Sequence, residues 1–130
     1  MIINVKTDKR TEMVDITSKV EDALKETGIM AGLVHLYSMH TTAAITINEN
    51  ADPDVRSDIS KTLDKLIPWE NNYQHMEGNS AAHLKTTLVG TSELIPIENG
   101  KLMLGTWQAV FFCEFDGPRH RKVKLTFMKS

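Results

Sequence analysis

Two histidines, a carboxylate and a carboxamide lie within nine residues near the middle of this 130-residue sequence. The stretch runs from His75 to His83 and contains Glu77 and Asn79, and Gly78 would let the backbone turn between them. Neutral imidazole is the commonest nitrogen ligand of zinc, and three protein ligands with one open position are typical of a catalytic zinc site. The stretch therefore indicates a metal centre, although its spacing matches no compact zinc motif.

A third histidine, His40, lies at the expected end of a strand, which would hold its ring rigidly. Together with His75 and His83 it would complete a three-histidine site. A metal bound there would act as an electrophile, or would activate water or a phosphate oxygen.

Groups that suit an anion accompany these histidines. Arg119 and Arg121 could bind phosphate, because the guanidinium group makes bidentate contacts with its oxygens. The hydroxyls of Thr41 and Thr42 lie beside His40, and a helix starting at Asp52-Pro53 would offer free N–H groups. The chain after Gly117 is basic and contains no carboxylate: its cations are Arg119, Arg121, Lys122, Lys124 and Lys129. This basic end suits a small phosphorylated ligand, but lysines on a solvated edge strand would explain it as well.

Four further polar or aromatic residues have two interpretations each. Glu49 has no structural need in a strand-to-helix loop and could orient a metal-bound imidazole or hold a proton. Asn50 is either a turn residue or part of the site, and Asp52 is either a helix N-cap or part of the site. Trp107 is either a core residue or a platform for a planar ligand.

The remaining histidines and the cysteine have simpler explanations. His35 lies on an apolar strand and His120 lies beside two arginines, so we expect both to be ordinary structural or surface residues. Cys113 ends the apolar run Val110–Cys113 and is expected to be a small core residue.

Local patterns predict the elements that position these groups. Helices are predicted from Thr17 or Ser18 to Gly28, from Pro53 to before Pro68, and over 80–89, closed by Gly90. Predicted strands span residues 2–5, 11–16, 33–39, 43–48, 93–98, 101–104, 107–115 and 122–128. The strands 33–39 and 43–48 are expected to be neighbours, and Asn99-Gly100 predicts a hairpin. The fold class is therefore α+β, with a mostly antiparallel, barrel-like sheet, two main helices and one short helix.

Composition limits the classes of function. The chain is 41% hydrophobic and 25% charged, which is typical of a globular protein, and its length suits one domain over residues 1–130. A net charge of −2 argues against general nucleic-acid binding, and no apolar run approaches the ~18 residues of a membrane span. A single cysteine and no recognisable signal peptide are consistent with a cytoplasmic protein.

Three long motifs resemble the YjbQ family, also named the secondary thiamine-phosphate synthase family. The first is HTTAAITINENADPDV at residues 40–55, the second is HMEGNSAAHLK at 75–85, and the third combines LGTWQ at 104–108 with EFDGPR at 114–119. The resemblance covers essentially the whole chain. It implies an α+β homotrimer whose shared pocket holds a divalent metal, with zinc as the expected ion and magnesium as the alternative.

The resemblance also implies roles for individual residues. The metal ligands would be His40, His75 and His83. The catalytic positions would be Glu49, Asp52, Glu77, Asn79, Asp116 and Arg119. The substrate-binding positions would be Thr41, Thr42, Asn50, Trp107 and Arg121.

Three functions remain open at this point. The first is a metal-dependent enzyme that acts on a phosphorylated small molecule. Its possible reaction is a weak thiamine-phosphate synthase activity, which joins hydroxymethylpyrimidine diphosphate to thiazole phosphate and releases pyrophosphate. In that enzyme Arg119 would neutralise departing charge, and Glu77 or Glu49 would handle a proton. The second is a non-catalytic metal- and anion-binding or regulatory trimeric module, and the third is a buried metal that cross-links subunits.

Overall fold

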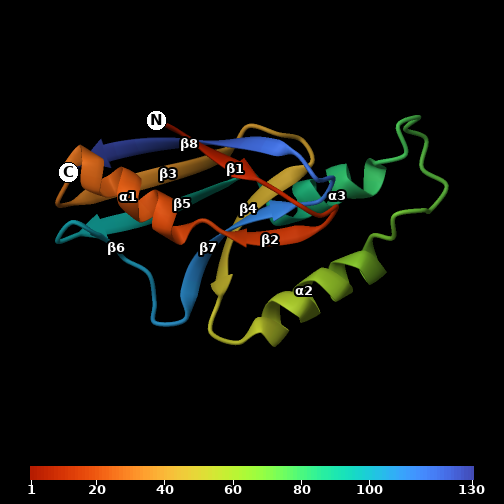
Figure 1. The fold of residues 1–130 in the computed structure, drawn as a ribbon, viewed down its shortest axis with the longest axis horizontal. Coiled ribbons are helices and arrows are strands. Elements are labelled where there is room, and N and C mark those ends of the chain that lie inside the picture. Colours follow the sequence, from red (N-terminus) through yellow and green to blue (C-terminus); the bar gives the residue numbers. More distant parts are fainter.

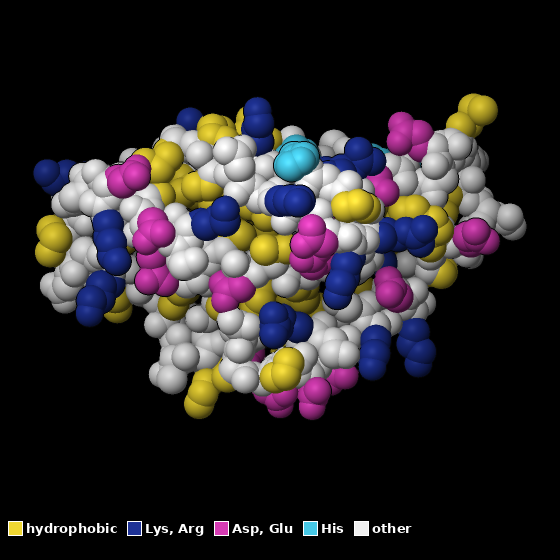
Figure 2. Space-filling view, in the orientation of Figure 1, with side chains coloured by type: hydrophobic (Ala, Val, Ile, Leu, Met, Phe, Trp, Pro, Cys, Tyr) yellow, Lys and Arg dark blue, Asp and Glu magenta, His cyan; other side chains and the backbone are white.

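The computed structural model describes residues 1–130 as eight strands and three helices (Figure 1). In chain order the elements are β1 (Ile2–Lys6), β2 (Glu12–Asp15), α1 (Thr17–Thr27), β3 (Gly32–Ser38), β4 (Ala43–Glu49), α2 (Pro53–Leu66), α3 (Ser80–Val89), β5 (Ser92–Glu98), β6 (Lys101–Leu102), β7 (Gln108–Glu114) and β8 (His120–Lys129). None of the helices is long and apolar enough to cross a membrane. On the face drawn in Figure 2, basic and acidic side chains are interspersed and no extended patch of one charge forms.

The strands form two curled antiparallel sheets. One has the order β1-β8-β3-β5-β6 and the other has the order β2-β7-β4. The main core lies between the sheets and beneath α1, and it includes Leu36, Ile45, Phe112, Leu125 and Leu24. The two sheets together make a half-barrel, which confirms the predicted α+β fold with a barrel-like antiparallel sheet.

Strand β7 is buried on both faces. Val110 and Phe112 point into the main core, whereas Phe111 and Cys113 belong to a second apolar cluster on the other face of the small sheet. Helices α2 and α3 lie at this side, at the opposite end of the molecule from α1 (Figure 1). The alternation along β7 therefore places one set of side chains in each layer.

Helix α2 begins as the sequence predicts. Asp52 is its N-cap, because the Asp52 carboxylate accepts a hydrogen bond of 2.9 Å from the Asp54 N–H, and Pro53 is the first helical residue. The apolar stripe of α2 contains no fully buried residue, and Leu66 is 68% exposed. This helix therefore packs loosely on the body of the protein.

Three details of the predicted fold are wrong. The N-cap of α1 is Ile16 and not Thr17 or Ser18; the Thr17 hydroxyl instead accepts the Val110 N–H, which joins the helix to β7. Strands β3 and β4 are not neighbours, because β3 pairs with β5 and β8 while β4 pairs with β7. The basic strand β8 is not an edge strand, since it lies between β1 and β3.

The predicted hairpin is confirmed. Asn99 and Gly100 both have positive φ, at 52° and 70°, as a two-residue type I′ turn requires, and they connect β5 to β6. Local turn chemistry determined this pairing. The pairings of β1 with β8 and of β2 with β7 are instead long-range.

Candidate functional site

One pocket collects most of the predicted site residues. It has a volume of about 480 Å³ and lies where β3 ends, β4 begins and the β7–β8 connection meets the segment before α3. We call it the histidine pocket. Its lining residues are Met39, His40, Thr41, Thr42, His75, Glu77, Asn79, His83, Asp116, Arg119 and Arg121.

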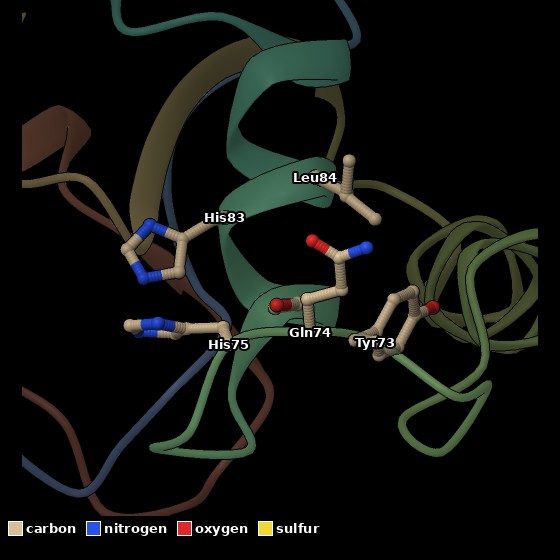
Figure 3. A pocket seen from close by; sticks show the side chains of 6 residues that line it. Tyr73, Gln74, His75, His83 and Leu84 are labelled. Carbon is tan, nitrogen blue, oxygen red and sulfur yellow. The ribbon is translucent and has the colours of Figure 1, made fainter.

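A tight turn and the start of α3 bring His75 and His83 together. The Gly78 N–H donates to the His75 carbonyl at 3.1 Å, and Gly78 has a φ of 77°, a conformation that glycine adopts easily. Helix α3 then begins at Ser80 and carries His83 in its first turns. The turn therefore folds the chain back so that the two imidazoles lie next to each other, edge to face (Figure 3).

The spacing of this histidine pair is that of an edge-to-face ring contact, and it is also compatible with two ligands of one divalent metal ion. The ring centroids are 5.4 Å apart and the ring planes are nearly perpendicular, at 82°. With Zn–N distances of about 2.0–2.1 Å, two imidazoles on one tetrahedral zinc ion have ring centres about 5 Å apart. No hydrogen bond within the protein occupies a ring nitrogen of either histidine. No group of three or more His, Cys, Asp or Glu side chains is close enough to surround an ion, so the pair would leave further positions to water or a ligand.

His40 is held differently. Its Nε2 accepts a hydrogen bond of 2.8 Å from the Lys122 backbone N–H. Burial lowers the pKa of His40; the positive charge of Arg121 lowers it further, Glu114 opposes this effect, and Arg119 and Lys122 add to it. The ring is therefore neutral at ordinary pH.

A buried ion pair supports the floor of the pocket. The guanidinium of Arg121 donates through Nε to Glu114 at 2.8 Å and makes a second, shorter bond to the same carboxylate. It also donates to the Thr42 hydroxyl at 2.9 Å, and the Thr7 hydroxyl donates to Glu114 at 2.7 Å. Burial would raise the pKa of Glu114, but these hydrogen bonds, one from the Asp116 N–H and the charge of Arg121 hold it below its ordinary value. Arg121 and Thr42 thus line the pocket while most of their hydrogen-bonding capacity is used inside the protein.

Arg119, Asp116 and Asn79 form a second polar chain on the pocket wall. Arg119 donates to the Asp116 carbonyl at 2.8 Å and to its carboxylate at 3.1 Å, and Asn79 donates to the same carboxylate at 2.9 Å. The Arg119 side chain is 52% exposed, so it keeps N–H groups for a ligand. The buried Oδ1 of Asn79 has no hydrogen-bond partner, which is the unusual case for a buried polar atom.

Four predicted site residues lie elsewhere. Glu49 ends β4, the strand that begins just after the histidine pocket, so about 20 Å of strand separates it from His40. Near Glu49, the Asn50 side chain donates to Asp15 at 2.5 Å, and Asp52 caps α2. Trp107 precedes β7 at this same end and is 63% exposed, so its interpretation as a core residue is wrong. The N-terminus of α2 is also at this end and does not face the pocket.

Glu114, the buried ion-pair partner of Arg121, is not among the site residues that the sequence motifs indicate. Glu114 follows Val110 and Phe112 at core-facing positions of β7, and Arg121 precedes Val123 on the core-facing side of β8. Opposite charges at two inward positions of adjoining segments would have been a usable signal, because buried charges are paired. The role of the Lys122 amide had no signal in the sequence.

Three expectations about background residues are confirmed. Cys113 is buried, and burial raises the pKa of its thiol to about 12. His35 stacks on Tyr37 on the outer face of β3, and His120 is an exposed residue at the start of β8; neither lines the histidine pocket.

Comparisons with known proteins agree on one family. A family model described as "UPF0047 protein YjbQ-like" matches residues 1–130. The UPF0047 protein YugU of Bacillus subtilis is 54% identical over 97% of this chain and 96% of its own length. The UPF0047 protein MJ1081 of Methanocaldococcus jannaschii is 54% identical over 91% of this chain and 86% of its own.

Solved structures show the same relationship. A YjbQ/UPF0047 family protein from Clostridium acetobutylicum superposes with a TM-score of 0.96 at 51% identity and covers 98% of this chain and 99% of that one. The protein APE1520 of Aeropyrum pernix superposes with a TM-score of 0.95 at 39% identity, covering 100% and 98% of the two chains. The chain therefore belongs to the UPF0047, YjbQ-like family.

Proposed function

We propose that this protein is a metal-dependent enzyme that acts on a phosphorylated small molecule in the histidine pocket. The observation that carries the proposal is the composition of that one pocket. It places the His75–His83 pair, with free ring nitrogens, beside the partly exposed guanidinium of Arg119. A metal ligand set and an anion-binding group in a shared pocket are what phosphate chemistry requires.

The size and charge of the pocket favour a small anionic ligand. A volume of about 480 Å³ suits a metabolite and is within the usual range of small-molecule sites. Arg119 is positioned by Asp116, and Asn79, whose side-chain nitrogen donates to the same carboxylate, lines the same pocket. The start of α3 at Ser80 adds N–H groups with positive partial charge nearby.

In this proposal His75 and His83 hold zinc, with magnesium as the less suitable ion because imidazole favours zinc. The bound metal would supply positive charge to phosphate oxygens. Glu77 lines the same pocket and is the better of the two carboxylates proposed for proton transfer, because Glu49 lies at the far end of β4 within one copy.

The specific reaction to test is thiamine-phosphate synthesis. The thiazole nitrogen would form a bond to the methylene carbon of hydroxymethylpyrimidine diphosphate, and the carbon–oxygen bond would break. Pyrophosphate would leave with the bonding electron pair. Arg119 would bind the departing pyrophosphate and offset its growing charge, and Thr41 would add a hydroxyl.

We propose further that the protein works as a homotrimer in the cytoplasm. The support is the division of the predicted site residues between the two ends of β4, because Glu49, Asn50 and Trp107 cannot reach the histidine pocket of their own copy. A neighbouring copy is the obvious source of such residues.

Metal analysis and turnover together test the proposed function. We expect untagged protein to bind about one zinc ion per chain and to release pyrophosphate from hydroxymethylpyrimidine diphosphate and thiazole phosphate. His83→Ala should lose both properties, whereas His120→Ala, which removes an exposed histidine outside the pocket, should keep them. Intact metal content and turnover in His83→Ala would refute the enzyme proposal. Binding of both phosphates without their consumption would favour the non-catalytic module.

A further inference from the structure

The hydrogen bond between His40 and the backbone of β8 determines which ring nitrogen carries the proton. A neutral imidazole has one N–H and one nitrogen with a lone pair. Since Nε2 accepts the Lys122 N–H at 2.8 Å, its lone pair is occupied and the proton lies on Nδ1. A backbone N–H can only donate, so this assignment cannot be reversed while the bond exists.

The position of the bond explains why it forms. Strand β3 ends at Ser38, opposite Val123, while β8 continues toward Lys122. The Lys122 carbonyl still accepts from the Met39 N–H, at 3.5 Å, but the Lys122 N–H is received by the ring of His40. His40 thus replaces the backbone acceptor that β3 no longer provides. Breaking this bond would transfer the exposed amide of Lys122 from the ring to water.

This arrangement conflicts with a role for His40 as a third metal ligand. Coordination through Nε2 would displace the Lys122 amide, and coordination through Nδ1 would require the ring to lose its remaining proton. His75 and His83 have no such restriction, because their ring nitrogens bind nothing within the chain. Two of the three histidines are therefore suited to a metal, and the third is suited to a different partner.

We infer that His40 binds an oxygen of a phosphate group through Nδ1–H and is not a ligand of the metal. This inference rests on the proposed function and assigns the phosphate-binding part of the same pocket. Nδ1 has no acceptor within the chain, and the ring lines the pocket with Arg119 and Thr41. A phosphate group is recognised by several converging donors, and an N–H, a guanidinium and a hydroxyl provide such a set. The metal pair His75–His83 lines the same pocket, so a phosphate could contact both halves of the site.

Nitrogen-15 NMR of the ligand-free wild-type protein tests the tautomer directly. A long-range ¹H–¹⁵N correlation spectrum should show His40 protonated at Nδ1 and unprotonated at Nε2, both before and after zinc is added. A His40 ring that is protonated at Nε2, or whose Nδ1 loses its proton when zinc binds, would overturn the inference. This measurement needs neither a variant nor a substrate.

Binding of inorganic phosphate and of zinc to matched variants tests the role. Glutamine at position 40 places an amide oxygen where Nε2 accepts the Lys122 N–H and removes the Nδ1 donor. We expect His40→Gln to bind zinc within about twofold of wild type and to bind inorganic phosphate about tenfold more weakly. His83→Gln should show the reverse pattern, with weakened zinc binding and unchanged phosphate binding in metal-free protein.

The outcomes separate this inference from the proposed function. Loss of zinc affinity in His40→Gln, to the extent seen in His83→Gln, would make His40 a metal ligand and overturn the inference alone. Unchanged phosphate affinity in His40→Gln would leave His40 as a cap for β8 and would also overturn it. Wild-type protein that binds neither zinc nor phosphate would overturn the proposed function, and the phosphate role of His40 with it.

Discussion

The Glu114–Arg121 pair supports the histidine pocket by stabilising the folded protein beneath it. Both side chains are almost completely buried, and Glu114 accepts hydrogen bonds from Arg121, Thr7 and the Asp116 amide. Removing one charge leaves the other buried without a partner, which costs about 3–5 kcal/mol. We therefore expect Glu114→Gln to lower the free energy of unfolding by that amount at pH 7, measured by urea denaturation.

The loss of stability caused by Glu114→Gln should become smaller as the pH falls. The folded protein holds the pKa of Glu114 below its ordinary value of 4.5, so the stabilisation is complete above that value and disappears as the pH falls through the lower, folded-state pKa. Wild type and Glu114→Gln should therefore converge in acid. Glu98→Gln, at an exposed hairpin position, is the control and should change stability by less than about 0.5 kcal/mol. A gap between wild type and Glu114→Gln that stays constant down to strongly acidic pH would contradict this account.

Cys113 provides a simple check on the second apolar cluster. Its thiol is buried, and burial raises its pKa to about 12, so almost no thiolate exists at pH 8. We expect a thiol reagent to label the folded protein at the rate of unfolding and to label urea-denatured protein at once. Rapid labelling of the folded protein would mean that the layer between α2 and the small sheet opens freely.

Among the elements, α2 has the weakest attachment to the body. It has no fully buried residue, and one of its polar links is the ion pair from the buried ammonium of Lys85 in α3 to Asp64. The start of α2 depends on the Asp52 cap. If Asp52 is a cap, its substitution should change stability, and if it is part of the site, its substitution should change turnover. We expect Asp52→Ala to cost about 1 kcal/mol of stability, and Asp52→Asn to cost little, because asparagine also caps helices well.

The same variants decide whether Asp52 also takes part in catalysis. If Asp52 is a cap alone, the asparagine variant keeps its turnover. Asp58→Ala, an exposed substitution farther along α2, is the control for stability and should leave it unchanged. Loss of turnover in Asp52→Asn without loss of stability would instead place Asp52 in the site. Thermal unfolding and pyrophosphate release measure the two properties separately.

At the scale of the whole molecule, the features that could be predicted from the sequence are those that depend on neighbouring residues in the chain. The Asp52-Pro53 start of α2, the Asn99-Gly100 turn and the buried position of Cys113 follow from single residues and their neighbours. The separation of β3 and β4 into different sheets could not be predicted, because each strand takes partners that are distant in the chain. The sequence likewise named most of the histidine pocket, but it could not show that a backbone amide of β8 occupies one nitrogen of His40.

The outer face of the five-stranded sheet is where we expect copies of the chain to meet. No helix covers this face, and it exposes apolar side chains on neighbouring strands: Tyr37 is 45% exposed, Leu94 51% and Met128 44%. Contiguous exposed apolar surface on a small protein usually marks an interface. Association would bury these side chains and, in a closed ring of three, could bring the Glu49 end of one copy to the histidine pocket of another.

Light scattering after size-exclusion chromatography tests this assembly. Wild type should have three times the mass of one chain, and Leu94→Lys should reduce it toward one, because a buried ammonium group would have no partner at the apolar contact. Leu66→Lys is the matched control: Leu66 is 68% exposed on α2, so a lysine there should leave the mass unchanged. A wild-type protein with the mass of one chain would refute the trimer. A trimer that survives Leu94→Lys would place the contact on another surface, and the Glu49 end of β4 would then need a different route to the pocket.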